Sequence, residues 1–484
     1  MKCALVIPPW QPGDIFPEKT ASSQINYWQP LGTLYVGAVL KNAGHDVVFL
    51  NGAFLSNEEI LEKLHQFKPG FAGIYSTAFG WKGAVRLASD IRKRTSNVFI
   101  TAGGPYPSAA KGGALNGAED IDAVVTGEGE VTVPELVKRL EKGESLAGLE
   151  GVIYRESGEI VSNNERKLID DLDSIPFPAR ELLGDFEKYL PAPATYRRKP
   201  VAVMMTSRGC DRKCIFCFQF DRERKSGIRY RSVENVMEEI ESCLRAGYRE
   251  IKFIDDTFTS DYDRAMRIAS EIKRRKLDFT WFASAIVNQV DKPLLKAFKE
   301  AGCWAILFGA ESGVQANLNT LRKGTTVEQV RKGVREAKEA GLKVFTPFLI
   351  GIPGETRENL QKTIDFTLEI DPDVVNFHYL TPFPGTELHD NIAKYGSMSD
   401  DLTEYTYQGG AFVPHSMSRG EMAEMRNLAF RKFYTRPRFL FRRTLGLRSA
   451  DDLKAAFSGL KSLFWILKEK ALFRRKKEKL SGSW

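Results

Sequence analysis

Three of the six cysteines fall within one short segment of the chain, SRGCDRKCIFCFQF at 207–220. Their spacing is Cys210-x-x-x-Cys214-x-x-Cys217, and thiolates spaced in this way can converge from one loop onto an iron–sulfur cluster. A cluster held by four thiolates is coordinatively closed, whereas three thiolates leave one iron open to a substrate or cofactor. A zinc site requires four ligands, and no histidine or fourth cysteine lies close to this segment. The segment therefore predicts an iron–sulfur cluster with an open iron.

The bulk properties indicate a globular protein of several domains that does not cross a membrane. A chain of 484 residues suggests roughly two to four domains. The longest apolar runs, such as LFWIL (463–467), are only a few residues long, whereas a spanning helix needs about 20. The N-terminal MKCALVIPPW lacks the charged start and long apolar core of a signal peptide, so we expect a cytoplasmic location.

The net charge of +8 is concentrated at the C-terminal end. Residues 431–480 contain 16 Lys or Arg and 4 Asp or Glu, a local charge of +12, so the rest of the chain carries −4. This distribution does not indicate a main body that binds nucleic acid. We expect residues 416–484 to be helical and basic. Within them, one helical stripe is apolar and lysines flank it: Leu453, Phe457, Leu460, Phe464 and Leu467. Such a helix suits an anionic membrane surface, and docking against the main body is the alternative.

Residues 1–145 alternate short apolar strands with amphipathic helices. We expect the strands at 3–7, 47–50, 71–75, 98–104 and 122–127. Apolar strands separated by helices predict a parallel sheet covered on both faces, which is a doubly wound, Rossmann-like domain. Ligands in such sheets bind at the carboxyl ends of the strands. The candidate ligand-binding residues at those ends are Pro9, Ser76, Thr77, Gly103, Gly104, Gly127, Glu128 and Glu130.

Residues 146–195 interrupt the alternation and predict a linker that contains a small hairpin at 151–161. From 196 to 415 the alternation resumes, with strands expected at 201–206, 251–255, 278–284, 304–312, 343–351 and 374–380. Six such units predict a full or partial α/β barrel whose active site lies at the carboxyl ends of the strands. The cysteine segment directly follows the first of these strands.

The cysteine spacing, with Phe216 as an aromatic residue before the last cysteine, resembles the signature of the radical S-adenosylmethionine (SAM) superfamily. The resemblance implies that Cys210, Cys214 and Cys217 hold a [4Fe-4S] cluster. Its open iron would chelate SAM, and an electron from the cluster would then cleave SAM to a 5′-deoxyadenosyl radical.

The same resemblance implies SAM contacts at the ends of later strands. Asp255-Asp256 stands where many members have a Gly-Gly-Glu run, and an ordinary acidic pair at a strand end is the alternative there. At Gly351 and Gly354 the alternative is a glycine turn. The implied contacts are Phe216 in the cysteine segment, Asp255 and Asp256 for the amino group, Glu311 and Ser312 for the ribose, and Gly351 and Gly354 for the adenine.

The first domain resembles the cobalamin-binding domain that precedes the barrel in class B radical SAM enzymes. The stretches that carry this resemblance are 30–52, 100–109, 124–130 and 171–180. The first loop lacks the Asp-x-His-x-x-Gly motif of proteins that ligate cobalt through histidine. The resemblance therefore implies base-off cobalamin without a histidine ligand, and a degenerate, empty pocket is the alternative.

These resemblances imply a cobalamin-dependent C-methyltransferase of the group that contains the hopanoid and bacteriochlorophyllide C-methylases and the anaerobic magnesium-protoporphyrin IX monomethyl ester cyclase. The cofactors carry the difficult steps, so no acid–base residue is nominated. We expect an apolar substrate, either a tetrapyrrole such as a bacteriochlorophyll precursor or a polycyclic lipid, and a reductant such as flavodoxin or ferredoxin. Oxidative cyclisation with the same cofactors is one alternative, and a cobalamin- or redox-responsive binding protein is another.

Overall fold

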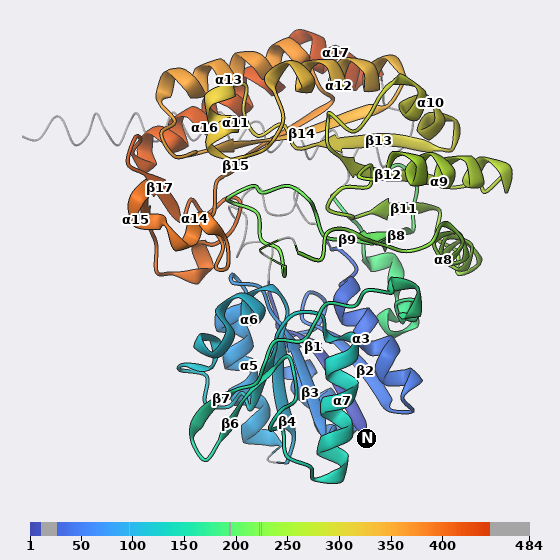
Figure 1. The fold of residues 1–484 in the computed structure, drawn as a ribbon, viewed down its shortest axis with the longest axis vertical. Helices are drawn as coiled ribbons and strands as arrows, with labels where there is room; N and C mark the ends of the chain where they lie inside the picture. The colour runs from blue at the N-terminus through green and yellow to red at the C-terminus, as the bar shows by residue number, and fades with distance from the viewer. Residues whose placement is uncertain (11–26, 96, 193–194, 222, 224, 446–484) are drawn as a thin grey trace, which may run out of the picture.

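The computed structural model describes residues 1–10, 27–95, 97–192, 195–221, 223 and 225–445. These residues form two α/β domains, each built on its own sheet, and the domains lie one above the other (Figure 1). The segment that follows β9 runs between the two domains. The apolar stripe and basic cluster that the sequence places within 446–484 lie outside the described residues.

The first sheet has seven strands in the order β2-β1-β3-β4-β5-β6-β7, of which the first five run parallel. The strands of this sheet are β1 (Lys2–Ile7), β2 (Asp46–Asn51), β3 (Phe71–Tyr75), β4 (Phe99–Gly103), β5 (Ala123–Val125), β6 (Val152–Glu156) and β7 (Glu159–Ser162). Its helices are α3 (Leu31–Asn42), α4 (Asn57–Phe67), α5 (Trp81–Arg94), α6 (Pro105–Ala110) and α7 (Gly129–Lys142).

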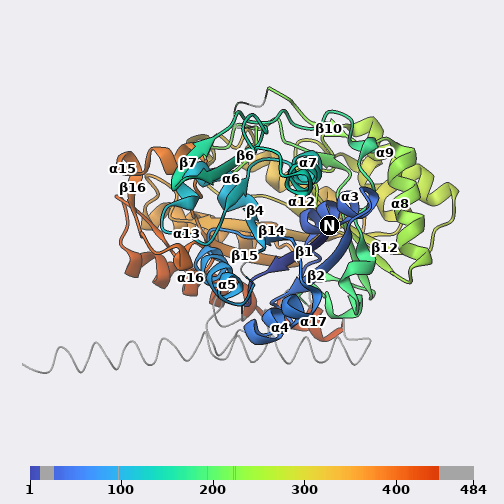
Figure 2. The ribbon, with the colours of Figure 1, turned by 90° about the horizontal axis from the view of Figure 1, so that it is seen from below.

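Helices cover both faces of the first sheet. Apolar residues of α3 and α7 pack in one core, and those of α4 and α5 pack in another. Figure 2 shows the two pairs of helices on opposite sides of the strands. The strands are nearly all apolar because both of their faces are buried, which confirms the expected doubly wound arrangement.

The hairpin expected within the linker belongs to the first sheet. β6 pairs antiparallel with β5, and β7 pairs antiparallel with β6. The turn between them places Ser157 at φ 51° and Gly158 at φ 87°, and two successive positive φ angles are the geometry of a tight hairpin turn. The rest of the segment up to 195 has only short 3₁₀ turns: Leu172–Ser174, Arg180–Leu183 and Phe186–Lys188.

The second sheet has six parallel strands in the order β15-β14-β13-β12-β11-β8, which is the order of the chain reversed. β8 and β15 are its two edges, so it is a partial barrel, as expected. Its strands are β8 (Val201–Met204), β11 (Glu250–Phe253), β12 (Thr280–Ala285), β13 (Cys303–Phe308), β14 (Lys343–Ile350) and β15 (Val374–Tyr379). The surrounding helices are α8 (Val233–Arg245), α9 (Tyr262–Arg274), α10 (Lys292–Glu300), α11 (Gln315–Thr320), α12 (Val327–Glu339), α13 (Arg357–Ile370), α16 (Arg419–Tyr434) and α17 (Pro437–Leu445).

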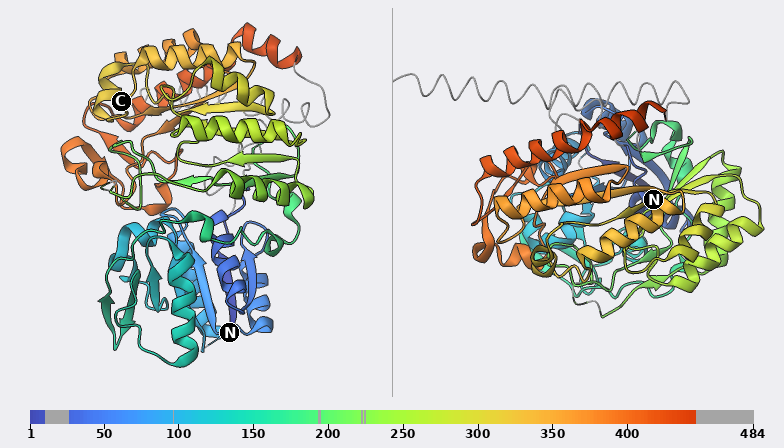
Figure 3. Two further views of the ribbon diagram at one scale, coloured as in Figure 1. Left: turned by 45° about the vertical axis from the view of Figure 1, so that its right-hand side comes forward. Right: turned by 90° about the horizontal axis from the view of Figure 1, so that it is seen from above.

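Three of these strands end two or more residues earlier than the sequence predicts. Residues 205–206, 254–255 and 309–312 lie in the loops at the carboxyl edge of the sheet, where Glu311 still bridges to Phe348 of β14. Short elements complete this edge: β9 (Ser207–Arg208), β10 (Arg229–Tyr230), α14 (Glu387–Asp390), α15 (Ile392–Tyr395), β16 (Gly396–Met398) and β17 (Phe412–Pro414). Figure 3 shows that this edge faces the first domain.

The free edge of β8 is covered by a side chain from the first domain. The Gln29 side chain accepts a hydrogen bond from the Val203 N–H at 3.1 Å and donates one to the Val201 carbonyl at 3.3 Å. Among the described residues, no helix is long and apolar enough to cross a membrane.

Candidate cofactor site between the two domains

The cysteine loop connects β9 to β10, which pair antiparallel at its base. Ile215 anchors the loop from within, because its N–H donates to the Leu321 carbonyl at 3.2 Å and its carbonyl accepts from the Leu388 N–H at 2.9 Å. Cys210 and Cys214 are partly exposed, Cys217 is exposed, and none forms a disulfide. The loop therefore presents three thiols while its middle is fixed to the barrel.

The three thiols lie close enough to influence one another electrostatically. Partial loss of solvent and the charges of Asp256, Cys214 and Cys210 together raise the pKa of Cys217 to about 11, against the opposing effect of the Lys323 ammonium. No three His, Cys, Asp or Glu side chains of the described chain converge on one metal-ion position. A cluster presents several irons and needs no such common point, so this donor set of three thiols beside one cation fits an iron–sulfur cluster.

The two aspartates after β11 have different surroundings. The Asp255 carboxylate is 3% exposed and accepts hydrogen bonds from the Thr206 N–H at 3.0 Å, the Thr206 hydroxyl at 2.8 Å and the Ser207 hydroxyl at 2.5 Å. Burial raises the pKa of Asp255 above its ordinary value. Asp255 thus fastens the chain just before the cysteine loop, whereas Asp256 lines the cavity beside Cys210.

Glu311, in the loop that follows β13, forms an ion pair with Lys323. The sequence pattern did not predict a role for this lysine. The Glu311 backbone has φ 59° and joins β14 through its N–H to the Pro347 carbonyl (3.1 Å). Its carboxylate accepts from Lys323 Nζ at 2.6 Å, and the charges of Cys214 and Cys217 also act on Lys323. Lys323 follows the short helix α11 in an ordinary polar stretch, so its spacing in the sequence gave no signal.

Ser312 forms its hydrogen bonds with its own loop, with α11 and with α13. It is fully buried, and its hydroxyl lies 3.0 Å from Thr363 Oγ1, accepts from Asn317 Nδ2 at 3.1 Å and accepts from the Val314 N–H at 3.2 Å. These bonds use its hydrogen-bonding capacity within the loop that follows β13. Ser312 therefore supports the loop that positions Glu311.

The glycine loop after β14 is organised around a buried glutamate. Gly351 and Gly354 have φ 87° and 77°, a region that favours glycine. The fully buried Glu355 carboxylate accepts from the Gly351 N–H at 2.9 Å and from Asn317 Nδ2 at 3.0 Å, and burial raises its pKa to about 7. Phe216 packs in a cluster with Leu349 and Ile352, so it joins the cysteine loop to this glycine loop.

A cavity of about 440 Å³ lies between the carboxyl edge of the first sheet and the cysteine loop. Five of the eight residues expected at the strand ends line it: Gly103, Gly104, Gly127, Glu128 and Glu130. From the barrel, its lining includes Gly209, Cys210, Phe218, Ile254 and Asp256. One cavity therefore contacts both the first domain and the first cysteine.

Pro9, Ser76 and Thr77 do not line this cavity. The Ser76 hydroxyl donates to the Thr77 carbonyl at 2.9 Å, and Thr77 Oγ1 accepts from the Gly80 N–H at 3.4 Å, so both shape the turn before α5. Pro9 packs against Gly52, where an added Cβ would lie 2.2 Å from the Pro9 nitrogen.

Glycines of the cavity wall have two different reasons to be glycine. Gly104 has φ 109°, and a Cβ there would lie 2.7 Å from the Ser76 carbonyl oxygen, so it is required by packing of the backbone; Gly127 has φ 75°, and a Cβ there would meet no atom within 4 Å, so its backbone is open to a ligand. Among the described residues that line the cavity, none is a histidine. The donor set therefore fits a cobalamin that has no histidine bound to cobalt, held against glycine backbone.

Glu128 and Glu130 form a buried ion-pair network with two arginines of the barrel. Arg229 donates to both oxygens of Glu128 at 2.8 Å, and Arg208 donates to Glu128 at 3.0 Å and to Glu130 at 2.6 Å. Arg208 belongs to β9 and Arg229 to β10, so the network holds both ends of the cysteine loop. We call these four residues the interdomain clamp.

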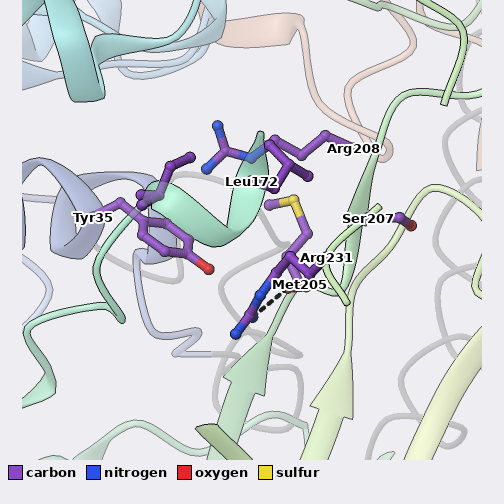
Figure 4. Close-up of a pocket in the computed structure, with 7 residues that line it drawn as sticks. Tyr35, Leu172, Met205, Ser207, Arg208 and Arg231 are labelled. Atoms are coloured by element: carbon purple, nitrogen blue, oxygen red, sulfur yellow. Dashed lines mark hydrogen bonds between the residues drawn. The ribbon is translucent and has the colours of Figure 1, made fainter. Parts of the chain in front are cut away.

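Beside the clamp, Tyr35 of α3 faces the barrel (Figure 4). The Arg208 guanidinium lies 5.3 Å from the Tyr35 ring centroid. Arg231 donates to the Met205 carbonyl at 2.9 Å and pairs with the buried Glu239. Through these contacts Arg231, which directly follows β10, holds Met205, which lies just before β9.

Two protein families match consecutive parts of the chain. Residues 22–137 match the B12 binding domain, and residues 204–367 match the radical SAM superfamily. An uncharacterised methyltransferase of Pyrococcus horikoshii is 35% identical over 85% of this chain and 89% of its own length. An anaerobic magnesium-protoporphyrin IX monomethyl ester cyclase of Rubrivivax gelatinosus is 27% identical over 85% of this chain and 75% of its own.

A solved structure has the same fold. The radical SAM methyltransferase TsrM of Kitasatospora setae, with cobalamin and a [4Fe-4S] cluster bound, superposes with a TM-score of 0.67 at 20% identity, covering 90% of each chain. The expected relationship to cobalamin-binding radical SAM enzymes and the expected fold class are confirmed.

Proposed function

The chain belongs to the radical SAM superfamily and carries a B12 binding domain, and from this premise we propose that it is a cobalamin-dependent C-methyltransferase. One observation supports this most strongly: the glycine-lined edge of the first domain and Cys210 line the same cavity. A methyl group carried on the first domain could therefore meet a substrate radical generated at the barrel within one cavity.

We assign the cluster to Cys210, Cys214 and Cys217. Among the candidate SAM contacts, Asp256 and Glu311 face the cysteine loop, and Lys323 beside Glu311 supplies a cation for the SAM carboxylate or the cluster charge. Asp255, Ser312 and Glu355 act by fixing the loops that hold these groups. When bound, the cofactors supply the radical and the methyl group, and the residues named here position them and exclude water.

The first test measures products from the anaerobically reconstituted full chain, with SAM, a reductant such as flavodoxin and a pooled tetrapyrrole or lipid extract. Methyl transfer predicts S-adenosylhomocysteine and 5′-deoxyadenosine together, both rising with substrate. It also predicts incorporation of the label from [methyl-¹³C]SAM into a product. The Cys214→Ala variant should lose iron and all SAM cleavage, because the cluster loses a ligand. Full activity of Cys214→Ala would refute the cluster assignment.

Oxidative cyclisation is the second candidate, because a relative over most of the chain is a magnesium-protoporphyrin ester cyclase. It would use the same cofactors but form a ketone whose new oxygen comes from water. The same assay separates the two candidates, because cyclisation would give 5′-deoxyadenosine without S-adenosylhomocysteine and without methyl label. Binding of cobalamin without any SAM cleavage would instead favour the binding-protein alternative.

We further propose that the basic C-terminal segment brings the enzyme to an anionic membrane surface, which would suit an apolar substrate. The support is the sequence alone, with its local charge of +12. Deleting residues 453–484 should reduce co-sedimentation with vesicles that contain phosphatidylserine. Vesicles of neutral phosphatidylcholine are the control, and undiminished binding of the shortened chain would favour docking of this segment against the main body.

A further inference from the structure

The inner face of the barrel sheet holds a lysine that none of the roles above uses. Ile251 and Phe253 of β11 pack in the main core under the helices, so Glu250 and Lys252, which alternate with them, lie on the opposite, inner face. Ile254 follows two residues later, and it lines the cavity beside the cysteine loop. Lys252 thus lies about 7 Å further into the barrel than the wall of that cavity.

Lys252 is held between two aromatic rings. Its Nζ lies 4.3 Å from the ring centroid of Trp28 and 4.3 Å from that of Phe282, and the residue is only 6% exposed. Ring faces attract a cation, but they do not replace a counter-ion. Within the part of the chain that the structure describes, no carboxylate forms an ion pair with Lys252.

The nearest acidic residue on this face is already satisfied by other groups. Glu250 Oε2 accepts from the Arg198 N–H at 2.8 Å and from the Thr280 hydroxyl at 2.7 Å, and its Oε1 accepts from Trp304 Nε1 at 3.0 Å. Burial lowers the pKa of Lys252 to about 7, and the Glu250 charge only partly opposes this effect. An added anion would favour the charged ammonium.

A second polar group without a partner lies on the same face, near the cysteines. His378 of β15 alternates with the core residues Phe377 and Tyr379, so it is on the inner face. Within the described chain its Nδ1 is buried without a hydrogen-bond partner, and burial lowers the pKa of His378 to about 4. It is therefore a neutral imidazole at neutral pH, able to hydrogen bond with a ligand.

His378 also connects this face to the cofactor site. Its ring lies 4.9 Å from the ring of Tyr407. The charges of Cys217 and Glu311 act on the Tyr407 phenol, so this side chain lies near the cysteine loop. Tyr407 is 59% exposed, so it stands at an open surface there.

We propose that the inner face of the barrel binds a substrate that carries an anionic oxygen group, which pairs with Lys252. The reacting end of this substrate would point toward His378, Tyr407 and the cysteine loop. This inference rests on the proposed function and narrows its substrate. A carboxylate-bearing molecule such as a tetrapyrrole supplies the anion that favours the charged form of Lys252, whereas a neutral polycyclic lipid supplies none.

The test measures binding by calorimetry on the reconstituted full chain without SAM or reductant, so its outcome does not depend on whether the enzyme methylates. The probes are naphthalene-1-acetate, its uncharged amide, and naphthalen-1-ylmethylphosphonate. The wild-type protein should bind the acetate at least tenfold more tightly than the amide. Lys252→Met should abolish this preference, Lys252→Arg should keep most of it, and Lys343→Met, on the exposed start of β14, should leave it unchanged.

Tighter binding of the phosphonate than of the acetate would identify a phosphate-bearing substrate, and the reverse order a carboxylate-bearing one. Equal binding of acetate and amide by the wild-type protein, or no binding of any probe at millimolar concentration, would overturn the proposal. So would an unchanged preference in a Lys252→Met protein that binds its normal amount of cobalamin. The wild-type comparison is informative even if Lys252→Met does not fold.

Discussion

Replacing Glu128 by glutamine tests whether the interdomain clamp holds the cysteine loop in place. The substitution keeps the size of the side chain and removes its charge. Glu128 is 5% exposed and accepts hydrogen bonds from Arg229, Arg208 and the Ile169 N–H, the last at 2.7 Å. In the variant, Arg229 keeps its hydrogen bond to the Ile169 carbonyl at 2.6 Å, and Arg208 keeps its bond to Glu130.

The expected cost follows from burial. Removing one partner of a buried pair leaves an uncompensated charge and costs about 3–5 kcal/mol. Arg229 and Arg208 are 8% and 13% exposed, so the remaining guanidinium groups are poorly solvated. Because these arginines belong to β9 and β10, we expect the loss to appear at the cysteine loop as a lower iron content after reconstitution. Anaerobic denaturant unfolding and iron analysis measure the two effects.

Glu135→Gln is the matched control, since it removes a carboxylate of the same domain that pairs with Arg166 and Arg139. Glu135 is 38% exposed, and exposed pairs contribute about 0–1 kcal/mol. Burial opposes ionisation of Glu128, but Arg229 and Arg208 hold its pKa below the ordinary value. Its contribution is therefore present above the ordinary pKa and lost as the pH falls through the lowered one. A Glu128→Gln protein with the stability and iron content of Glu135→Gln would refute the role of the clamp.

The site makes two further predictions. Asp255→Ala should lower the free energy of unfolding by about 2–4 kcal/mol, because the Thr206 N–H and two hydroxyls lose their acceptor. Asp256→Ala should leave the free energy of unfolding unchanged and weaken SAM binding in equilibrium dialysis. Equal losses of stability in the two variants would contradict the separate roles of Asp255 and Asp256. The raised pKa of Glu355, about 7 against an ordinary 4.5, means that the wild-type protein loses stability as the pH rises from 4.5 to 7, by on the order of 3 kcal/mol. Glu355→Gln lacks this loss of stability with rising pH. The melting temperature of Glu355→Gln minus that of the wild-type protein should therefore increase from pH 5 to pH 8. If that difference stays constant over this pH range, Glu355 is not a buried, protonated side chain.

The sequence was sufficient where local pattern determines structure. The spacing of Cys210, Cys214 and Cys217 predicts that they share one loop, and the structure places them in the loop between β9 and β10. Strands such as β1 and β3 follow from runs of apolar residues, which suit a strand buried on both faces. The order of the second sheet follows from six repeated units, because successive parallel strands tend to be neighbours.

The direction of individual side chains could not be predicted in the same way. Asp255 and Asp256 are adjacent in the sequence, yet one binds the end of β8 and the other lines the cavity, because consecutive residues at a strand end point to opposite sides. Glu128 and Glu130 were expected at a ligand, and their arginine partners lie about 80 to 100 residues away in the chain. Lys252 did leave a signal, since a lysine within the buried strand β11 is unusual.

The hydrogen bonds of Gln29 to β8 have a consequence for producing the two domains separately. An unpaired edge strand is a template on which another chain can add and aggregate. Here the edge of the second sheet is closed by a residue of the first domain, which the ribosome completes earlier. A barrel expressed from residue 196 onward would fold with β8 uncovered. The first domain thus protects the barrel from self-association through the β8 edge. A barrel expressed alone should therefore be co-expressed with the first domain.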